Sequence, residues 1–210
     1  MYDLVQHFNY NKKEILDTIN KILSKGILEL GPEVEKFEKN FSKYCNAKYC
    51  VTVSSGSMGL LLALKVFDLK KNDEVITVAN SDIPTSHAIS LNGAKIKWVD
   101  VEEGSFNINP EEVEKKINKN TKIIIPVHLF GVPANMNAII KIAKKNNVKI
   151  VEDACLATGS SFGNKKIGSI GDITVFSTNP GKVLDGIGHG GIITTNSKKK
   201  YSQIKKMIAH

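Results

Sequence analysis

Short apolar runs alternate with amphipathic segments through most of the chain, and this alternation restricts the fold more than any other feature. The runs V-I-T-V and I-I-I-P-V are apolar throughout, which is typical of strands that are covered on both faces of a parallel sheet. We expect strands at residues 49–53, 74–78, 95–99, 123–127 and 148–151, with helices at 58–67, 85–91, 110–118 and 135–145 between them. The pattern predicts a three-layer α/β fold with a mostly parallel sheet between helices.

Two further helices are expected ahead of this alternation. Apolar residues recur at helical spacing over residues 10–25, and a second helix is expected after the Gly31-Pro32 pair, where acidic residues occupy the first turn. We interpret both helices as scaffold. The chain is accordingly divided into an N-terminal helical segment, residues 1–30, and one α/β domain, residues 31–210.

The formal net charge of +8 raises the possibility of a nucleic-acid partner. All 29 basic residues are lysines, however, and base readout and stacking depend heavily on arginine. The lysines are also spread over the expected helix faces instead of forming one stripe. A solvated lysine-rich surface is the favoured explanation, and a nucleic-acid binder is the less favoured alternative.

Neither a membrane nor a metal is expected as a partner. No apolar run approaches the length of a membrane span, and the first residues lack a basic segment followed by an apolar one, so we expect a cytoplasmic protein. The three cysteines, Cys45, Cys50 and Cys155, are odd in number and lack metal-ligand spacing. We expect them to be reduced thiols packed inside the protein.

Two charged residues occupy unusual positions. Lys182 follows an apolar run in a turn rich in glycine and proline, and Asp153 lies at the end of another apolar run. An amine in a partly desolvated site becomes a nucleophile towards carbonyls, and an acid can keep a pyridinium nitrogen protonated so that the ring accepts electrons. Together they indicate pyridoxal phosphate, although Asp153 could instead cap a helix and Lys182 could be a surface charge.

The turn S-S-G-S at residues 54–57 is a candidate phosphate cradle. Small residues that open a helix leave backbone N–H groups pointing outward, with the positive end of the helix dipole behind them. Such turns are also common for steric reasons alone. Because ligands of parallel sheets lie beyond the carboxyl ends of strands, Ser55, Asp153 and Ser177 could belong to one site.

The order of these motifs resembles one family. E-D-A at Glu152, G-D-I-x-V-F-S ending at Ser177, a lysine six residues after the Phe of that motif, and then G-x-G-G-x-I-x-T are similar to sugar aminotransferases called DegT/DnrJ/EryC1/StrS. Further matches run from G-P-E-V-E-K-F-E at Gly31 to T-T-N-S at Ser197. The resemblance implies the pyridoxal-phosphate transferase fold of type I, with residues 31–210 as its large cofactor-binding domain.

The resemblance also implies roles for individual residues. Lys182 is similar to the lysine that holds the cofactor covalently and moves the proton, and Asp153 to the partner of the ring nitrogen. S-G-S-M matches the segment S-G-T-A that holds the phosphate, and Ser177 matches a further phosphate ligand; the matching segment contributes Gly56, Ser57 and Met58. His128 is expected to be a hydrogen-bonded scaffold histidine.

Three positions depart from the family pattern. Asp82 stands where an aromatic ring usually contacts the cofactor, Leu156 where a glutamine usually follows the nitrogen-binding acid, and His189 where a glutamate is usual. We keep the first two as cofactor-binding positions. The departures indicate a divergent subfamily or, as the alternative, a non-catalytic paralogue.

By resemblance, the protein transfers an amino group from glutamate or glutamine to a nucleotide-linked keto-sugar, as a homodimer, in polysaccharide or secondary-metabolite biosynthesis. In one dehydratase branch of the family the lysine is a histidine, so Lys182 favours transamination. Family members continue into a small C-terminal domain. We therefore expect a truncated chain of low activity, in which the absence of arginine removes the usual clamp for a donor carboxylate.

Overall fold

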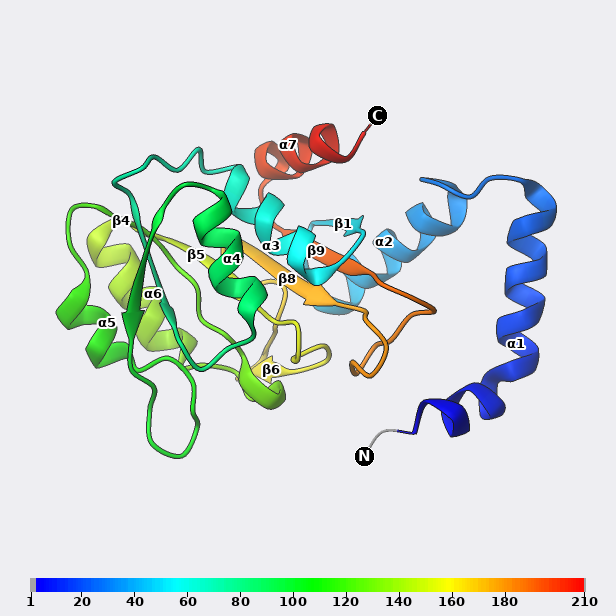
Figure 1. Ribbon diagram of the computed structural model, residues 1–210, viewed down its shortest axis with the longest axis horizontal. Helices are drawn as coiled ribbons and strands as arrows, with labels where there is room; N and C mark the ends of the chain where they lie inside the picture. Colours follow the sequence, from blue (N-terminus) through cyan, green and yellow to red (C-terminus); the bar gives the residue numbers. More distant parts are fainter. Residues whose placement is uncertain (1–2, 210) are drawn as a thin grey trace.

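A seven-stranded sheet forms the centre of the computed structural model, which describes residues 3–209 (Figure 1). The strand order is β1-β9-β8-β5-β4-β2-β3, and β9 runs antiparallel to both of its neighbours while the other pairs are parallel. The strands are β1 (Tyr49–Val53), β2 (Glu74–Val78), β3 (Lys95–Val99), β4 (Thr121–Ile124), β5 (Lys149–Asp153), β8 (Ile173–Ser177) and β9 (Gly191–Thr195). The predicted α/β fold with a mostly parallel sheet is confirmed.

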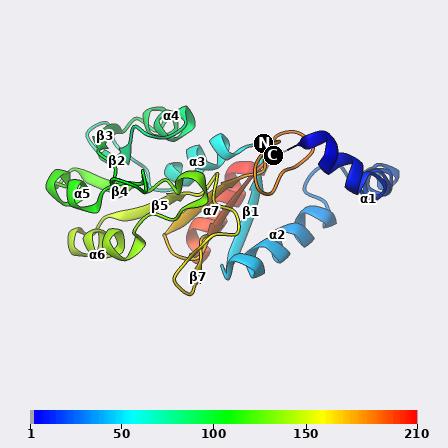
Figure 2. The ribbon, with the colours of Figure 1, turned by 90° about the horizontal axis from the view of Figure 1, so that it is seen from below.

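Helices cover both faces of this sheet (Figure 2). They are α2 (Pro32–Cys45), α3 (Gly56–Lys65), α4 (Ile83–Leu91), α5 (Pro110–Lys116), α6 (Met136–Asn146) and α7 (Lys198–Ile208). Successive strand residues point to opposite faces, so Ile123 packs in the cluster formed with α3, α4 and α7, whereas Ile124 packs with α5 and α6. The two apolar layers explain why the central strands are apolar throughout.

Element boundaries shift by a few residues from those expected. α3 begins at Gly56, and β4 ends at Ile124. Pro126 has no N–H to give to the strand ladder, yet its carbonyl accepts from the Asp153 N–H at 2.9 Å. The chain thus leaves the regular strand while it remains tied to β5. A small hairpin, β6 (Ser161–Phe162) and β7 (Lys165–Lys166), and the short helix η1 (Leu129–Gly131) complete the fold.

The first helix, α1 (Leu4–Lys25), stands to one side of the sheet (Figure 1). It is longer than expected because Asp3 caps it by accepting from the Val5 and Gln6 N–H groups. None of its residues is buried, so α1 adds no side chain to the core formed by the described residues. The interpretation of α1 as scaffold therefore stays a prediction, without support from packing in this core. Residues 1, 2 and 210, which the two predicted segments include, lie outside the described residues.

Within residues 3–209, no helix combines the length and the apolar character that crossing a bilayer requires.

Candidate functional site

The carboxyl ends of β1, β5 and β8 lie at one edge of the sheet and bring together segments far apart in the chain. Val53 and Ser177 both pair with Gly191 at the start of β9, so the turn after β1 lies beside the end of β8. Asp153 ends β5, the strand next to β8. Ligands of such sheets bind beyond this edge.

A cavity at this edge collects most of the predicted site residues. It is lined by Gly56, Ser57, Leu60, Asp82, Pro84, Thr85, Asp153, Cys155, Ser177, Asn179 and Lys182. Six of the eight residues predicted to serve the site are in this lining, and Met58 and Leu156 are not. Larger hollows of about 590 and 510 Å³ lie along α1, but their linings contain no lysine in a strand-end turn facing a buried acid.

The turn after β1 has two backbone donors without an acceptor inside the helix, at the buried Gly56 and the exposed Ser57. Ser55 caps α3: its hydroxyl accepts from the Met58 N–H at 3.1 Å and its carbonyl accepts from the Gly59 N–H at 2.9 Å. The N–H groups of Gly56 and Ser57 precede the first helical hydrogen bond, so they can serve an anion at the positive end of the helix. The Met58 N–H is already engaged, and its side chain lies outside the cavity lining.

A close backbone approach holds this turn against β9. A Cβ atom on Gly191 would lie 2.4 Å from the carbonyl carbon of Ser55 and 2.7 Å from the nitrogen of Gly56. No side chain fits there without moving the backbone of the turn. Gly191 therefore lets β9 approach the N-terminus of α3 closely.

Lys182 lies in a turn that backbone hydrogen bonds define. Its N–H donates to the Asn179 carbonyl at 3.0 Å, and the Gly186 N–H donates to the Thr178 carbonyl at 2.8 Å. Gly181 adopts a φ of 86°, a conformation that favours glycine. The turn brings the half-buried Lys182 into the cavity lining, which a solubilising surface charge would not require.

Asp153 is buried at the end of β5, and the residues after it form turns instead of a helix. The interpretation of Asp153 as a helix cap is therefore wrong. Its Oδ2 accepts from the Thr85 hydroxyl at 2.6 Å, and its Oδ1 accepts from the Cys155 N–H at 3.1 Å. The Cys155 thiol also hydrogen-bonds to this carboxylate. A carboxylate has about four acceptor sites, so the cavity-facing acid can bind a further donor.

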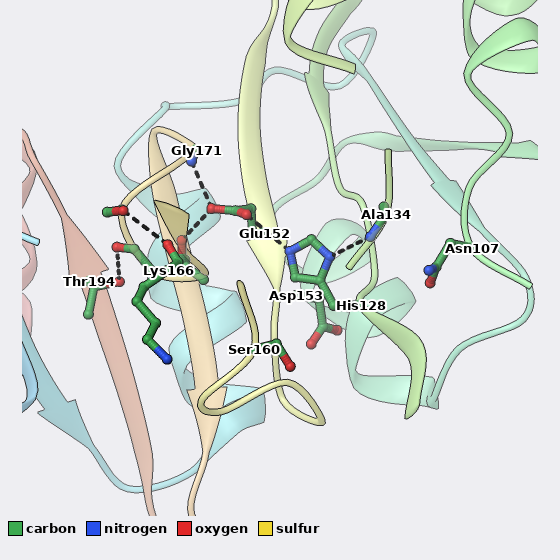
Figure 3. A network of polar contacts seen from close by, with 12 residues as sticks. Asn107, His128, Ala134, Glu152, Asp153, Ser160, Lys166, Gly171 and Thr194 are labelled. Carbon is green, nitrogen blue, oxygen red and sulfur yellow. Dashed lines mark hydrogen bonds and ion pairs between the residues drawn. The ribbon is translucent and has the colours of Figure 1, made fainter. Parts of the chain in front are cut away.

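A fully buried pair lies next to Asp153 (Figure 3). The His128 Nε2 is 3.0 Å from the Glu152 Oε2, and the Glu152 Oε1 accepts from the Gly171 N–H at 2.7 Å and the Thr174 hydroxyl at 2.6 Å. The His128 Nδ1 accepts from the Ala134 N–H at 3.1 Å, so the ring carries its proton on Nε2 and donates to Glu152. The prediction that His128 is a hydrogen-bonded scaffold histidine is confirmed.

Five residues of the lining were not predicted, namely Leu60, Pro84, Thr85, Cys155 and Asn179. Thr85 lies three residues after Asp82, and this helical spacing could have indicated that both face the same side of the first turn of α4. Asn179 precedes the lysine in the same turn. Cys155 follows Asp153 by two residues, and burial raises the pKa of its thiol well above the ordinary value of 9.0, with the Asp153 carboxylate adding to the rise and Lys182 opposing it. This thiol is a poor nucleophile.

Comparison with known proteins assigns the family. Residues 9–210 match the model of the DegT/DnrJ/EryC1/StrS aminotransferase family. The chain belongs to that family. The predicted family membership is thus confirmed over nearly the whole chain.

Three proteins illustrate the likeness. A dTDP-3-amino-3,6-dideoxy-alpha-D-galactopyranose transaminase from Aneurinibacillus thermoaerophilus is 43% identical over 88% of this chain and 51% of its own length. The crystal structure of S. venezuelae DesV in complex with a ketimine intermediate has a TM-score of 0.94 and 35% identity, covering 97% of this chain and 55% of that one. An E. coli GDP-4-keto-6-deoxy-D-mannose-3-dehydratase with bound hydrated PLP has a TM-score of 0.87 and 31% identity, covering 93% and 51%. The chain spans about half the length of these relatives.

The three departures from the pattern of this family have different surroundings. Asp82 lines the cavity at the N-terminus of α4, where its carboxylate makes no capping bond to the helix. Leu156 packs instead against the apolar cluster between the sheet and α6. The exposed His189 has its Nδ1 3.2 Å from the Asn179 Oδ1, so it contacts a lining residue without being one. Only the Asp82 departure changes the lining itself.

Proposed function

We propose that this chain binds pyridoxal 5'-phosphate at the carboxyl edge of the sheet, with residues 31–210 as the cofactor-binding domain. The carrying observation is that one cavity is lined by an amine, a buried carboxylate and a helix N-terminus. These groups match the three parts of the cofactor, which are a carbonyl, a ring nitrogen and a phosphate. The donor set of the cavity therefore fits the group.

Each residue has a distinct task in this proposal. Lys182 binds the carbonyl carbon through its amine and, once freed, moves the proton of the reacting amine carbon. Asp153 accepts from the protonated ring nitrogen through a lone pair that Thr85 and Cys155 leave available. The Gly56 and Ser57 N–H groups and the Ser177 hydroxyl hold the phosphate. Met58 and Leu156 remain predicted cofactor positions without support from the cavity lining.

The proposed reaction is transfer of an amino group from glutamate or glutamine to a nucleotide-linked keto-sugar. The donor becomes a keto acid, and its nitrogen replaces the ketone oxygen of the sugar. When bound, the cofactor supplies a ring that takes up the electron pair left when a proton leaves the amine-bearing carbon. The substrate class is supported by the relative from Aneurinibacillus thermoaerophilus, which is 43% identical and is named as the transaminase of a dTDP-linked sugar.

Dehydration of a keto-sugar is the second candidate, because one structural relative is named as a dehydratase. The presence of Lys182 favours transamination, since one dehydratase branch of the family has a histidine at this position. A panel of keto-sugar nucleotides with glutamate distinguishes the two: transamination yields an amino sugar and a keto acid in equal amounts. Loss of a sugar hydroxyl without transfer of nitrogen to the sugar would favour the dehydratase.

The cofactor assignment is tested by absorption. Protein mixed with pyridoxal phosphate should develop a visible band, and borohydride should abolish this band while it reduces the C=N bond and fixes the cofactor to the protein. Lys182→Ala should show neither the band nor the fixed cofactor, while circular dichroism remains unchanged. Lys165→Ala, on the exposed hairpin residue Lys165, is the matched control and should keep the band. A wild-type protein without a lysine-dependent band would refute the proposal and favour the non-catalytic paralogue.

We also propose that the protein forms a homodimer and acts in the cytoplasm. Support for the dimer comes from the apolar side chains that α1 and the lysine turn expose, among them Phe8, Val183 and Ile187. Sedimentation at micromolar concentration tests the dimer, and a stable monomer would contradict it. Cell fractionation tests the location, and recovery in the membrane or culture medium would contradict it.

A further inference from the structure

We propose that Thr85 is a positioning residue that holds the Asp153 carboxylate for the ring nitrogen of the cofactor, an inference that rests on the proposed function. Thr85 is buried and its hydroxyl donates to the Asp153 Oδ2 at 2.6 Å. This is the shortest side-chain contact that Asp153 makes among the described residues. Thr85 lies on α4, whereas Asp153 lies at the end of β5, so this contact joins two different elements.

The direction of this hydrogen bond is fixed by donor counting. A threonine hydroxyl has one proton, and an ionised carboxylate only accepts, so Thr85 gives its proton to Asp153. The Ser81 Oγ lies 2.8 Å from the Thr85 Oγ1, and it must therefore be the donor in that contact. The resulting chain runs from Ser81 through Thr85 to Asp153 and prevents the Thr85 hydroxyl from turning away.

The consequence is a carboxylate with a fixed plane. The Cys155 N–H holds Oδ1 and the Thr85 hydroxyl holds Oδ2, so rotation about the last side-chain bond of Asp153 would break one contact or both. The remaining lone pairs therefore keep one direction towards the cavity. A preoriented acceptor binds a charged donor without the cost of ordering it first.

A double-mutant cycle between the protein and the cofactor tests this role. Thr85→Val keeps the shape of the side chain and removes the hydroxyl. Binding of pyridoxal phosphate, measured by calorimetry, should weaken by about ten-fold, the order expected for part of a charge-assisted hydrogen bond. Binding of a carbocyclic analogue, in which the ring nitrogen is replaced by C–H, should change by less than about two-fold, because the analogue has no group for Asp153 to bind.

Two further variants separate positioning from packing. Thr85→Ser keeps the hydroxyl and should retain wild-type affinity. Thr77→Val is the matched control, because Thr77 on β2 is buried and its hydroxyl donates to the Ile125 carbonyl at 3.0 Å. This variant should reduce thermal stability without changing the ratio of the affinities for pyridoxal phosphate and the carbocyclic analogue. If Thr85→Val does not fold, Thr85→Cys, which has a weaker donor in the same place, is measured with the same expectation.

The proposal is overturned if Thr85→Val binds pyridoxal phosphate as tightly as the wild type does, or if it weakens both ligands equally. These results differ from failure of the proposed function. If the proposed function were wrong, the wild-type protein itself would form no lysine-dependent visible band.

Discussion

Replacing Glu152 by glutamine should destabilise the protein, although the two side chains have almost the same shape. Glu152 is fully buried and accepts from three donors, which are the Gly171 N–H, the Thr174 hydroxyl and the His128 Nε2–H. A glutamine has one accepting oxygen and one donating nitrogen. One of the two oxygen positions of Glu152 must therefore become a donor.

Neither orientation of the glutamine satisfies the network. If its nitrogen faces His128, the ring must move its proton to Nδ1, where the Ala134 N–H already donates at 3.1 Å. If its nitrogen faces Gly171, two N–H donors meet at the position of a 2.7 Å hydrogen bond. Either way a buried donor loses its acceptor, which costs ~1–3 kcal/mol, and the remaining bonds lose their charge assistance.

We therefore expect Glu152→Gln to lower the free energy of unfolding by about 3 kcal/mol, which is equivalent to a fall in Tm of about 6–12 °C in a chain of this size. Urea denaturation followed by circular dichroism measures the change. Glu14→Gln on the exposed surface of α1 is the control for the chemical substitution and should stay within about 0.5 kcal/mol of the wild type. A Glu152→Gln protein as stable as the wild type would refute the assigned tautomer of His128 and the donor count built on it.

Gly191→Ala should unfold the protein or displace the turn after β1, because the added methyl group would overlap the backbone of Ser55. The melting temperature and the amide exchange of that turn measure these two effects. A variant with both quantities unchanged would contradict the close approach. The free energy of unfolding should fall between about pH 9 and about pH 12, because burial raises the pKa of the Cys45 thiol from 9.0 to about 12 and the unfolded chain therefore loses this proton first. In urea titrations at several pH values, Cys45→Ala should flatten this fall. An equal slope of unfolding free energy against pH in both proteins would contradict the assignment. Asp82→Phe should tighten binding of pyridoxal phosphate, since it removes a carboxylate from the lining of an anion site; weaker binding by calorimetry would show that Asp82 contributes to the site.

The strand-end residues of the site could be predicted from sequence because their positions depend on local patterns. An apolar run that ends in Asp153 or Ser177 places that residue at the edge of a parallel sheet whatever the strand order is. The same holds for the small-residue turn that opens α3. These local rules brought the acid, the lysine turn and the small-residue turn to one edge of the sheet, where they line one cavity.

The rest of the site depends on packing between elements that are distant in sequence. Thr85 reaches Asp153 across 68 residues, and no periodicity within α4 reveals that contact. Leu156 was placed in the site by family position alone, but the turns after Asp153 direct it into the apolar cluster beside α6. The antiparallel direction of β9 was also not predicted, since a single apolar run does not indicate its orientation.

The position of β9 has a consequence for the order of folding. In the sheet, β1 joins the other strands through β9, so Tyr49–Val53 finds its neighbour only when Gly191–Thr195 has been synthesised. During translation the parallel strands β2, β3, β4, β5 and β8 can associate earlier, while the turn after β1 still lacks the backbone of β9 against which it packs. We expect the proposed cofactor site to be among the last parts of this chain to form on the ribosome, and nascent chains released before residue 191 to expose the turn to protease.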